Sequence, residues 1–359
     1  MTIETETANP RPATSAPTIS VIVPAYNAAH YMERSLPPLI AMKERGDILE
    51  LIVVDDCSTE PSNIDTAISF GATVLQMPKN GGPGAARNLA ATKAEGDILW
   101  FVDADVIAHM SGPERIREAF QDRAVAAVFG SYDQHPPGRS FASGYKNLVH
   151  RYYHQHGNRD SSTFWSGCGA IRRDVFAEMG GFDCKVYERP SIEDIEFGFR
   201  MKAAGWSIHL IPTVLGTHLK EWTLWEVIRT DIFQRAIPWS QLIIEGRGPS
   251  DDLNVSQSER FKAVLAGVWL LSLLALLVPM TWPASLAIFA ITSTTVIISN
   301  LELIKFFARN KSIGFAFIAT IYHQFYYLYS AITFTLCMVA NILKKKPTAL
   351  RESKTIRQE

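Results

Sequence analysis

Short apolar runs alternate with longer amphipathic segments from Ile19 onward. The runs are ISVIV, LELIVV, ATVLQM and ILWFV, and helical patterns at 31–45, 63–70 and 83–94 separate them. Runs that are apolar throughout are typical of strands buried on both faces, and intervening helices of about 10 to 15 residues are typical of βαβ units. The chain therefore predicts an α/β fold, in which helices flank a Rossmann-like sheet that is parallel or mixed.

Segments of different composition follow or precede this region. Residues 1–18 contain no apolar core, so we expect a disordered tail that is not a signal peptide and lies in the cytosol. Residues 125–245 are less regular and are expected to complete the same body. The turn-rich residues 246–260 predict a linker, and residues 344–359 form a basic tail.

Uncharged apolar stretches dominate residues 261–343 and predict a membrane region of two to three helices. About 20 apolar residues cross the hydrocarbon core of a bilayer. The stretch 263–282 meets that length, 284–300 is marginal unless 301–307 extends it, and 313–343 exceeds it.

Basic residues around these stretches bear on their orientation. Lys305, Arg309 and Lys311 lie between the second and third stretches, and the loop at Pro283 carries no charge, which suits a hairpin with its cations in the cytosol. A third span that starts inside would carry the lysines at 344–346 outside. The sequence leaves open whether the third stretch lies partly in the membrane interface.

Composition excludes several classes of protein. The 359 residues are 47% hydrophobic and 20% charged, which rules out a wholly disordered, collagenous or coiled-coil chain. The formal net charge of -1 provides no positive field for nucleic acid. The four cysteines form no CxxC pair, so neither a zinc ribbon nor a disulfide framework is expected, and a reducing compartment fits.

Polar groups follow directly after the apolar runs. Ligands of open α/β sheets bind beyond the carboxyl ends of the strands. Asp103 and Asp105 follow ILWFV, and two carboxylates at this spacing can converge on one divalent cation and a sugar hydroxyl. Asp55 and Asp56 end the run LELIVV. One of these two is expected to cap the following helix, which leaves the other for a base or ribose.

The sequence NGGPGAARN at 80–88 has features of a phosphate-binding loop. Glycines let the backbone approach an anion at a helix N-terminus, and Arg87, one turn into that helix, would supply a permanent cation. The segment lacks the lysine of a Walker loop and the spacing GxGxxG. An ordinary loop and helix start is therefore an equal alternative.

Seven motifs in one order make the chain similar to the family 2 glycosyltransferases. They are PAYN, VVDDCS, GGPGAARN, FVDAD, FWSGCGAIRR, SIEDIEFGFR and THLKEW, and they cover about residues 19–239. The resemblance implies the GT-A fold for a catalytic domain at 19–245, with a nucleotide-binding half at 19–124 and an acceptor half at 125–245. It also implies that Pro24, Tyr26 and Asp56, with Asp55 as the close alternative, hold the nucleoside. Arg87 would face the diphosphate or the nucleotide.

The same resemblance implies a metal site. Asp103 would contact ribose or sugar and belong to the metal site, and Asp105 would bind the metal. His218 would complete the set of ligands. A divalent metal, Mg²⁺ or Mn²⁺, is the cofactor that the resemblance implies.

The resemblance further places the acceptor. Asp194 matches the general base of the family, and Glu193 is the second member of that acidic pair. A helix start with Ser191 as N-cap and Asp194 at N3 is the alternative reading of the same pair. Trp165, Gly167 and Cys168 resemble the acceptor-side turn, in which Trp165 would stack on a sugar.

We expect an inverting, metal-dependent transfer of one sugar from a cytosolic nucleotide-sugar donor to a lipid-linked or membrane-proximal acceptor. We expect the protein in the inner or plasma membrane, with its catalytic domain on the cytoplasmic side. No nucleic acid is expected as a partner. Processive synthases carry a QxxRW element, whereas residues 234–239 read QRAIPW. A processive synthase, a silent nucleotide-sugar-binding scaffold and a nucleotidyltransferase remain alternatives, the last without its lysine signature.

Overall fold

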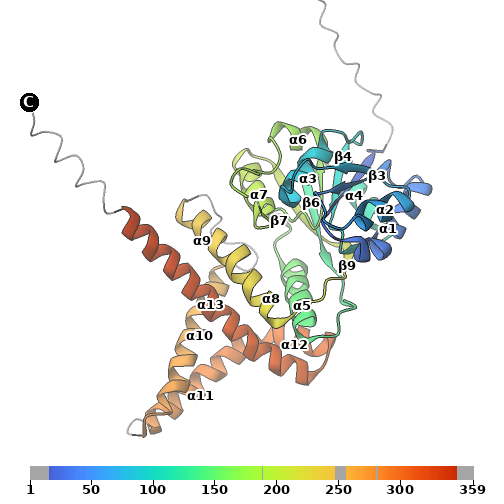
Figure 1. Ribbon diagram of the computed structural model, residues 1–359. Helices are drawn as coiled ribbons and strands as arrows, with labels where there is room; N and C mark the ends of the chain where they lie inside the picture. The colour runs from blue at the N-terminus through green and yellow to red at the C-terminus, as the bar shows by residue number, and fades with distance from the viewer. Residues whose placement is uncertain (1–15, 188, 247–255, 280–281, 346–359) are drawn as a thin grey trace, which may run out of the picture.

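The computed structural model describes residues 16–187, 189–246, 256–279 and 282–345. The tails predicted at 1–18 and 344–359, and the linker predicted at 246–260, lie largely outside these residues. Figure 1 shows an α/β body built from the first part of the chain, and long helices from the last part that extend away from it.

A mixed sheet forms the centre of the body. Within the described residues it has nine strands in the order β3-β2-β1-β4-β8-β6-β9-β5, and β7 pairs with β9 beside this path. The strands are β1 (Ile19–Ala25), β2 (Glu50–Asp55), β3 (Thr73–Gln76), β4 (Ile98–Val102), β5 (Val106–Ala108), β6 (Val125–Tyr132), β7 (Asp160–Ser161), β8 (Cys168–Arg172) and β9 (Ser207–His218). Strands β3, β2, β1 and β4 are parallel, and β8 lies antiparallel between β4 and β6. The predicted α/β sheet is confirmed.

Helices flank this sheet and continue into the C-terminal region. The three helices predicted from the sequence are confirmed as α1 (Ala29–Glu44), α2 (Ser62–Ser69) and α3 (Gly82–Ala91). The others are α4 (Gly112–Ala119), α5 (Phe141–His156), α6 (Arg173–Glu178), α7 (Glu193–Ala203), α8 (Leu224–Arg229), the π-helix η1 (Thr230–Ala236), α9 (Ile237–Ile244), α10 (Gln257–Ala275), α11 (Trp282–Ser299), α12 (Leu301–Asn310) and α13 (Ile313–Lys345).

Apolar layers on both faces of the sheet explain why the interiors of β1 and β4 are mostly apolar. Neighbouring residues of a strand point to opposite faces. Val21 of β1 packs in one layer with Met32 of α1, and Ile22 packs in the other with Ala86 of α3 and Phe197 of α7. All five side chains are fully buried. The strand interiors therefore serve packing, and the polar groups lie at the strand ends.

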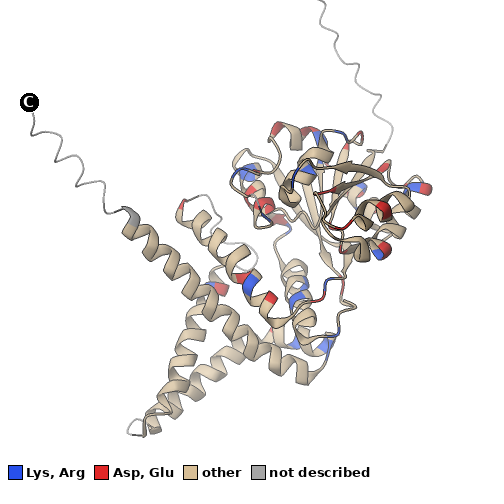
Figure 2. Cartoon of the chain, viewed as in Figure 1, with Lys and Arg blue, Asp and Glu red and all other residues tan. Residues whose placement is uncertain are grey.

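Two helices in the described part of the chain are long and apolar enough to cross a membrane. They are α11 and the part of α13 at Ile313–Leu343. Only 17% and 11% of their most apolar windows are buried, and Figure 2 shows almost no charged residue along either helix. The stretches 284–300 and 313–343 thus have the predicted length and composition.

The stretch 263–282 does not form such a helix, contrary to the prediction. Helix α10 includes three charged residues among its first six and ends at Ala275, so its apolar part is short. The residues at 301–307 do not extend α11 either. The backbone turns at Asn300, where φ is −108°, and α12 begins there as a separate helix.

Buried polar contacts join the C-terminal helices to the body, in addition to apolar packing. Glu259 of α10 is 7% exposed. It accepts hydrogen bonds from Tyr153 of α5 at 2.7 Å and Tyr327 of α13 at 2.6 Å, and Lys262 donates to it at 2.6 Å. This carboxylate therefore links three helices that are far apart in the sequence.

Candidate functional site

The carboxyl ends of β1, β2 and β4 lie at one edge of the sheet, because these strands are parallel neighbours. Tyr26 directly follows β1, Asp55 ends β2, and Asp103 directly follows β4. Pro24 is buried within β1, whereas Tyr26 is 49% exposed. Of Pro24 and Tyr26, which are both among the residues predicted to hold the nucleoside, only Tyr26 presents its side chain to solvent.

Asp55 stabilises the turn after β2. It is 4% exposed, and its carboxylate accepts hydrogen bonds from Asn63 at 2.6 Å and from the N–H of Ser58 at 3.2 Å. Helix α2 begins only at Ser62 and has no side-chain cap. The prediction that an aspartate caps this helix is therefore wrong, because the chain makes a turn with positive φ at Cys57 (61°) before the helix starts.

Asp56 binds the glycine loop. Its two oxygens accept the N–H groups of Gly81 and Gly82, each at 2.8 Å, and the residue is 4% exposed. Burial raises the pKa of Asp56, while the two backbone hydrogen bonds act in the opposite direction. A phosphate-binding loop would offer these N–H groups to its ligand. Because a carboxylate already occupies them, the alternative of an ordinary loop and helix start holds.

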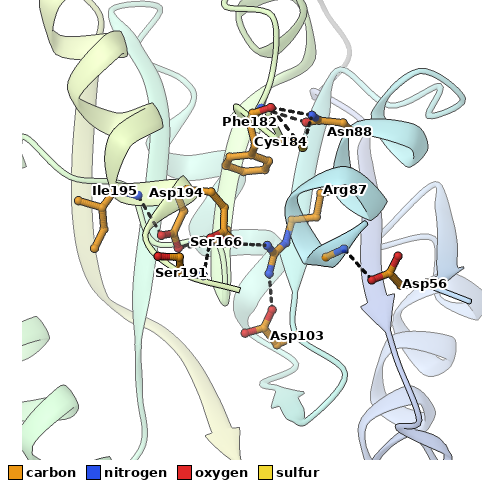
Figure 3. Close-up of polar contacts among 12 residues, drawn as sticks. Asp56, Arg87, Asn88, Asp103, Ser166, Phe182, Cys184, Ser191, Asp194 and Ile195 are labelled. Atoms are coloured by element: carbon orange, nitrogen blue, oxygen red, sulfur yellow. Dashed lines mark hydrogen bonds and ion pairs between the residues drawn. The ribbon is translucent and has the colours of Figure 1, made fainter. Parts of the chain in front are cut away.

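Arg87 of α3 connects two carboxylates from distant parts of the chain. Its side chain is 3% exposed, donates to Oδ1 of Asp103 at 2.5 Å, and lies 3.8 Å from Oε1 of Glu193. Figure 3 shows Arg87 reaching from α3 towards Asp103 and towards the segment that carries Asp194. Its Nε atom is buried without a hydrogen-bond partner. Arg87 therefore joins the two predicted halves of the domain.

Burial dominates the ionisation of both carboxyl groups that Arg87 contacts. Burial raises the pKa of Glu193 to about 7, the charge of Asp194 adds to the rise, and Arg87 opposes it. Burial likewise raises the pKa of Asp103 against the charge of Arg87. Arg87 thus supplies positive charge beside both carboxyl groups. The pKa of Glu193, whose side chain is buried, lies near neutral pH.

Asp105 and His218 form a second pair at the same edge. Oδ2 of Asp105 lies 3.5 Å from Nε2 of His218, and antiparallel pairing of β5 with β9 places Val106 opposite His218. Burial raises the pKa of Asp105, but the hydrogen bond and charge of His218 outweigh it and lower the pKa. A carboxylate and an imidazole so placed could hold a divalent cation. Within the described residues no group of three such ligands converges, and Asp103 is engaged by Arg87.

Asp194 is oriented by Ser166. Its Oδ2 atom accepts hydrogen bonds from the N–H of Ser166 at 2.9 Å and from the hydroxyl at 3.0 Å (Figure 3). The charge of Asp194 also acts on Asp103. Helix α7 has Ile192 at its N-cap position and no side-chain cap, so the alternative reading with Ser191 as N-cap is wrong.

The turn at 165–168 belongs largely to the core. A Cβ on Gly167 would lie 2.7 Å from the indole of Trp165, so glycine makes room for that ring. Cys168 is fully buried in β8, and burial raises the pKa of its thiol to about 12. The acceptor-side assignment of Gly167 and Cys168 stays a prediction. Trp165 is partly exposed, and its role stays a prediction.

Aromatic rings behind the Asp105–His218 pair were not predicted. Tyr132 of β6 stacks on His218 with ring centroids 4.5 Å apart and an angle of 11°. No motif marks Tyr132. Ser166 was also missed, although it lies within the motif FWSGCG and its hydroxyl could have been recognised there as a partner for a carboxylate.

Comparisons with known proteins agree with this geometry. Residues 20–180 match the family model of glycosyl transferase family 2. The pre-mycofactocin glycosyltransferase of Mycobacterium tuberculosis is 29% identical over 243 residues, which are 61% of this chain and 48% of that protein. This chain therefore spans about half the length of that relative. The O-antigen chain rhamnosyltransferase WbaN of Salmonella anatum is 26% identical over 268 residues, 71% of this chain and 84% of that protein.

A solved structure shares the fold. The mannosyltransferase PcManGT of Pyrobaculum calidifontis, in complex with GDP-Man and Mn²⁺, has a TM-score of 0.53 at 18% identity, and the match covers 90% of this chain and 88% of that one. The mixed sheet, the family match and this likeness agree with one another. Residues 20–180 thus match glycosyl transferase family 2, and the body that contains them has the GT-A fold.

Proposed function

We propose that the chain transfers one sugar from a nucleotide-sugar donor to a lipid-linked or membrane-proximal acceptor, with inversion and with a divalent cation. The observation that carries the proposal is the bridge from Asp103 through Arg87 to Glu193, next to Asp194. The bridge supports a single cleft in which a donor bound near Asp103 faces an acceptor bound near Asp194.

The donor would lie along the strand ends. Tyr26 exposes its ring at the end of β1, where it would contact a nucleoside. Asp105 and His218 would hold Mg²⁺ or Mn²⁺, which fits the oxygen-rich diphosphate chemistry. When bound, this cation neutralises charge on the leaving nucleotide. The Mn²⁺ and GDP-Man in PcManGT support this assignment.

Asp194 would act as the general base. An inverting displacement needs a carboxylate beside the acceptor hydroxyl, on the side opposite the departing nucleotide. The acceptor oxygen bonds to the anomeric carbon, the bond from that carbon to the diphosphate breaks, and the hydroxyl proton passes to Asp194. Two hydrogen bonds from Ser166 to one oxygen restrict the rotation of the carboxylate. Glu193 is engaged by Arg87 and would tune the local charge.

The apolar helices α11 and α13 support an acceptor at a membrane surface. With these helices in the inner or plasma membrane, the catalytic body would lie on the cytoplasmic side, where nucleotide sugars are available. Lys305, Arg309 and Lys311 lie between the two helices and favour that side for their connection.

The substitution Asp194→Asn tests the proposal. Nucleotide release from a panel of nucleotide sugars, measured with the detergent-solubilised protein and membrane lipid, should fall by roughly 10² to 10⁴. Nucleotide affinity should stay unchanged, because the carboxamide keeps the size of the side chain. Asp65→Asn, at an exposed position on α2, is the matched control. Unchanged turnover in Asp194→Asn would contradict the assignment of the base.

A further inference from the structure

Three basic side chains, here called the basic cluster, lie between the Asp105–His218 pair and helix α13. They are Lys146 of α5, Lys220 in the segment after β9, and Arg235 of η1. The Nζ atoms of Lys220 and Lys146 lie 4.1 and 5.9 Å from the centre of the Trp222 ring. Figure 2 shows basic positions on α5 and on the helical segment that contains α8 and η1. The cluster therefore combines three segments that are distant in the sequence.

Positive charge in the basic cluster exceeds the negative charge paired with it. Lys146 forms an ion pair with the buried Asp231. Lys220 and Arg235 have no ion-pair partner in the part of the chain that the structure describes, although the charge of Lys220 acts on Asp105. Burial, and next the charge of Arg235, lower the pKa of Lys146 to about 8. This crowding of like charges would be relieved by an anion.

A buried hydrogen-bond donor lies in the same place. Trp222 is 8% exposed, and its Nε1 atom has no hydrogen-bond partner. The indole N–H can only donate, so leaving it unpaired costs free energy. The backbone of this residue is anchored, because the main-chain N–H of Trp222 donates to Oγ of Ser143 at 2.8 Å. An anionic oxygen bound here could accept a hydrogen bond from the indole N–H and pair with the neighbouring cations.

The position of the cluster indicates where that anion comes from. Leu219, next to Lys220, donates its N–H to the carbonyl of Asp105 at 2.8 Å, so the cluster adjoins the candidate metal pair. On the other side, Tyr329 of α13 donates to Asp231 at 2.8 Å. The cluster thus lies between the catalytic edge and the middle of the apolar helix α13.

We propose that the basic cluster binds the phosphate group of a phosphorylated lipid, and that this lipid carries the acceptor hydroxyl to Asp194. This inference rests on the proposed function, because it assigns an acceptor to the same cleft. Phosphate oxygens form strong charge-assisted hydrogen bonds with Lys and Arg, and one oxygen would accept the N–H of Trp222. A neutral lipid would leave both the surplus cations and this donor unpaired.

A binding experiment on the full chain in detergent micelles tests the inference. Farnesyl phosphate, farnesol and inorganic phosphate serve as probes, and titration calorimetry gives each Kd. Farnesyl phosphate should bind most tightly. The double variant Lys220→Gln with Arg235→Gln should weaken its binding about tenfold or more, since two charged contacts are lost. The matched control, Lys93→Gln with Arg123→Gln, removes two exposed charges elsewhere and should change nothing.

Three results would overturn the inference. One is that farnesol binds as tightly as farnesyl phosphate, which would show that the protein does not recognise the phosphate. A second is that inorganic phosphate binds as tightly as farnesyl phosphate, which would show that the protein does not recognise the lipid chain. The third is a double variant that binds farnesyl phosphate as tightly as the wild type does. If that variant loses affinity for UDP or GDP and not for farnesyl phosphate, the cluster binds the donor.

Nucleotide binding separates this inference from the proposed function. The affinities of the wild type for UDP and GDP with Mn²⁺ are measured in the same micelles. If the wild type binds farnesyl phosphate through the cluster but no nucleotide, the proposed transfer reaction is contradicted and the phosphate site stands. If nucleotide binds and the variant keeps its farnesyl phosphate affinity, only the phosphate site is contradicted. Retained nucleotide affinity in the variant also shows that it is folded.

Discussion

Glu193 should make the stability of the protein depend on pH near neutrality. Its pKa in the folded protein is about 7, compared with an ordinary value of 4.5. A difference of about 2.5 units corresponds to about 3 kcal/mol of unfolding free energy, since one unit is about 1.4 kcal/mol. The side chain is 8% exposed, so solvent screens little of this energy.

The sign of the effect follows from the protons bound in each state. Between about pH 4.5 and pH 7 the unfolded chain has released the Glu193 proton, whereas the folded chain retains it. Raising the pH through this window therefore favours the unfolded state. The contribution of Glu193 is harmless below pH 4.5 and costs up to about 3 kcal/mol above pH 7. Glutamine, which resembles the protonated acid, avoids this cost.

Unfolding of the wild type and Glu193→Gln in detergent, without metal or nucleotide, measures the effect. The stability of the variant relative to the wild type should rise between pH 5 and pH 8 by up to about 3 kcal/mol. Comparing the two proteins at each pH cancels the groups that they share. Glu114→Gln, at an exposed position on α4, should leave the pH dependence unchanged. A difference between wild type and Glu193→Gln that is constant over this range would refute the reasoning.

Three further substitutions test other parts of the structure. Asp105→Ala should abolish both transfer and Mn²⁺ binding in the presence of nucleotide, and full wild-type activity in chelator would contradict the metal site. Gly167→Ala should lower stability by about 1 to 3 kcal/mol in thermal unfolding, because its Cβ meets the indole at 2.7 Å; Gly267→Ala, with nothing within 4 Å, should not. Asp231→Asn should cost about 3 kcal/mol or more by leaving Lys146 buried and unpaired, whereas Tyr329→Phe should cost about 1; equal losses would contradict this difference.

The sequence was most informative where one pattern has one structural solution. The apolar runs that became β1, β2 and β4 have no polar face, so only a sheet covered on both sides accommodates them. Their parallel pairing then brings Tyr26, Asp55 and Asp103 to a common edge. The antiparallel position of β8 could not be deduced, because strand direction depends on contacts between distant segments.

The errors arose where one residue type serves several purposes. A carboxylate after a strand can cap the next helix or bind a turn, and Asp55 binds the turn after β2 and does not cap α2. A serine before a helix can be its N-cap or part of the preceding loop, and α7 has Ile192 in place of Ser191 at the N-cap position. The apolar stretch at 263–282 has enough residues for a span, but hydropathy does not reveal that its helix ends at Ala275. Each choice is decided by contacts that the sequence does not encode locally.

The tyrosines of α13 restrict how this helix can move. Tyr327 and Tyr329 are two positions apart, so they point about 200° apart around the helix axis, and each donates to a different buried carboxylate, Glu259 or Asp231. Rotating or sliding α13 would deprive at least one of these carboxylates of its phenol. The helix and the catalytic body should therefore tilt together as one rigid unit. A change in the thickness of the surrounding lipid layer that tilts α13 would then also displace Lys146.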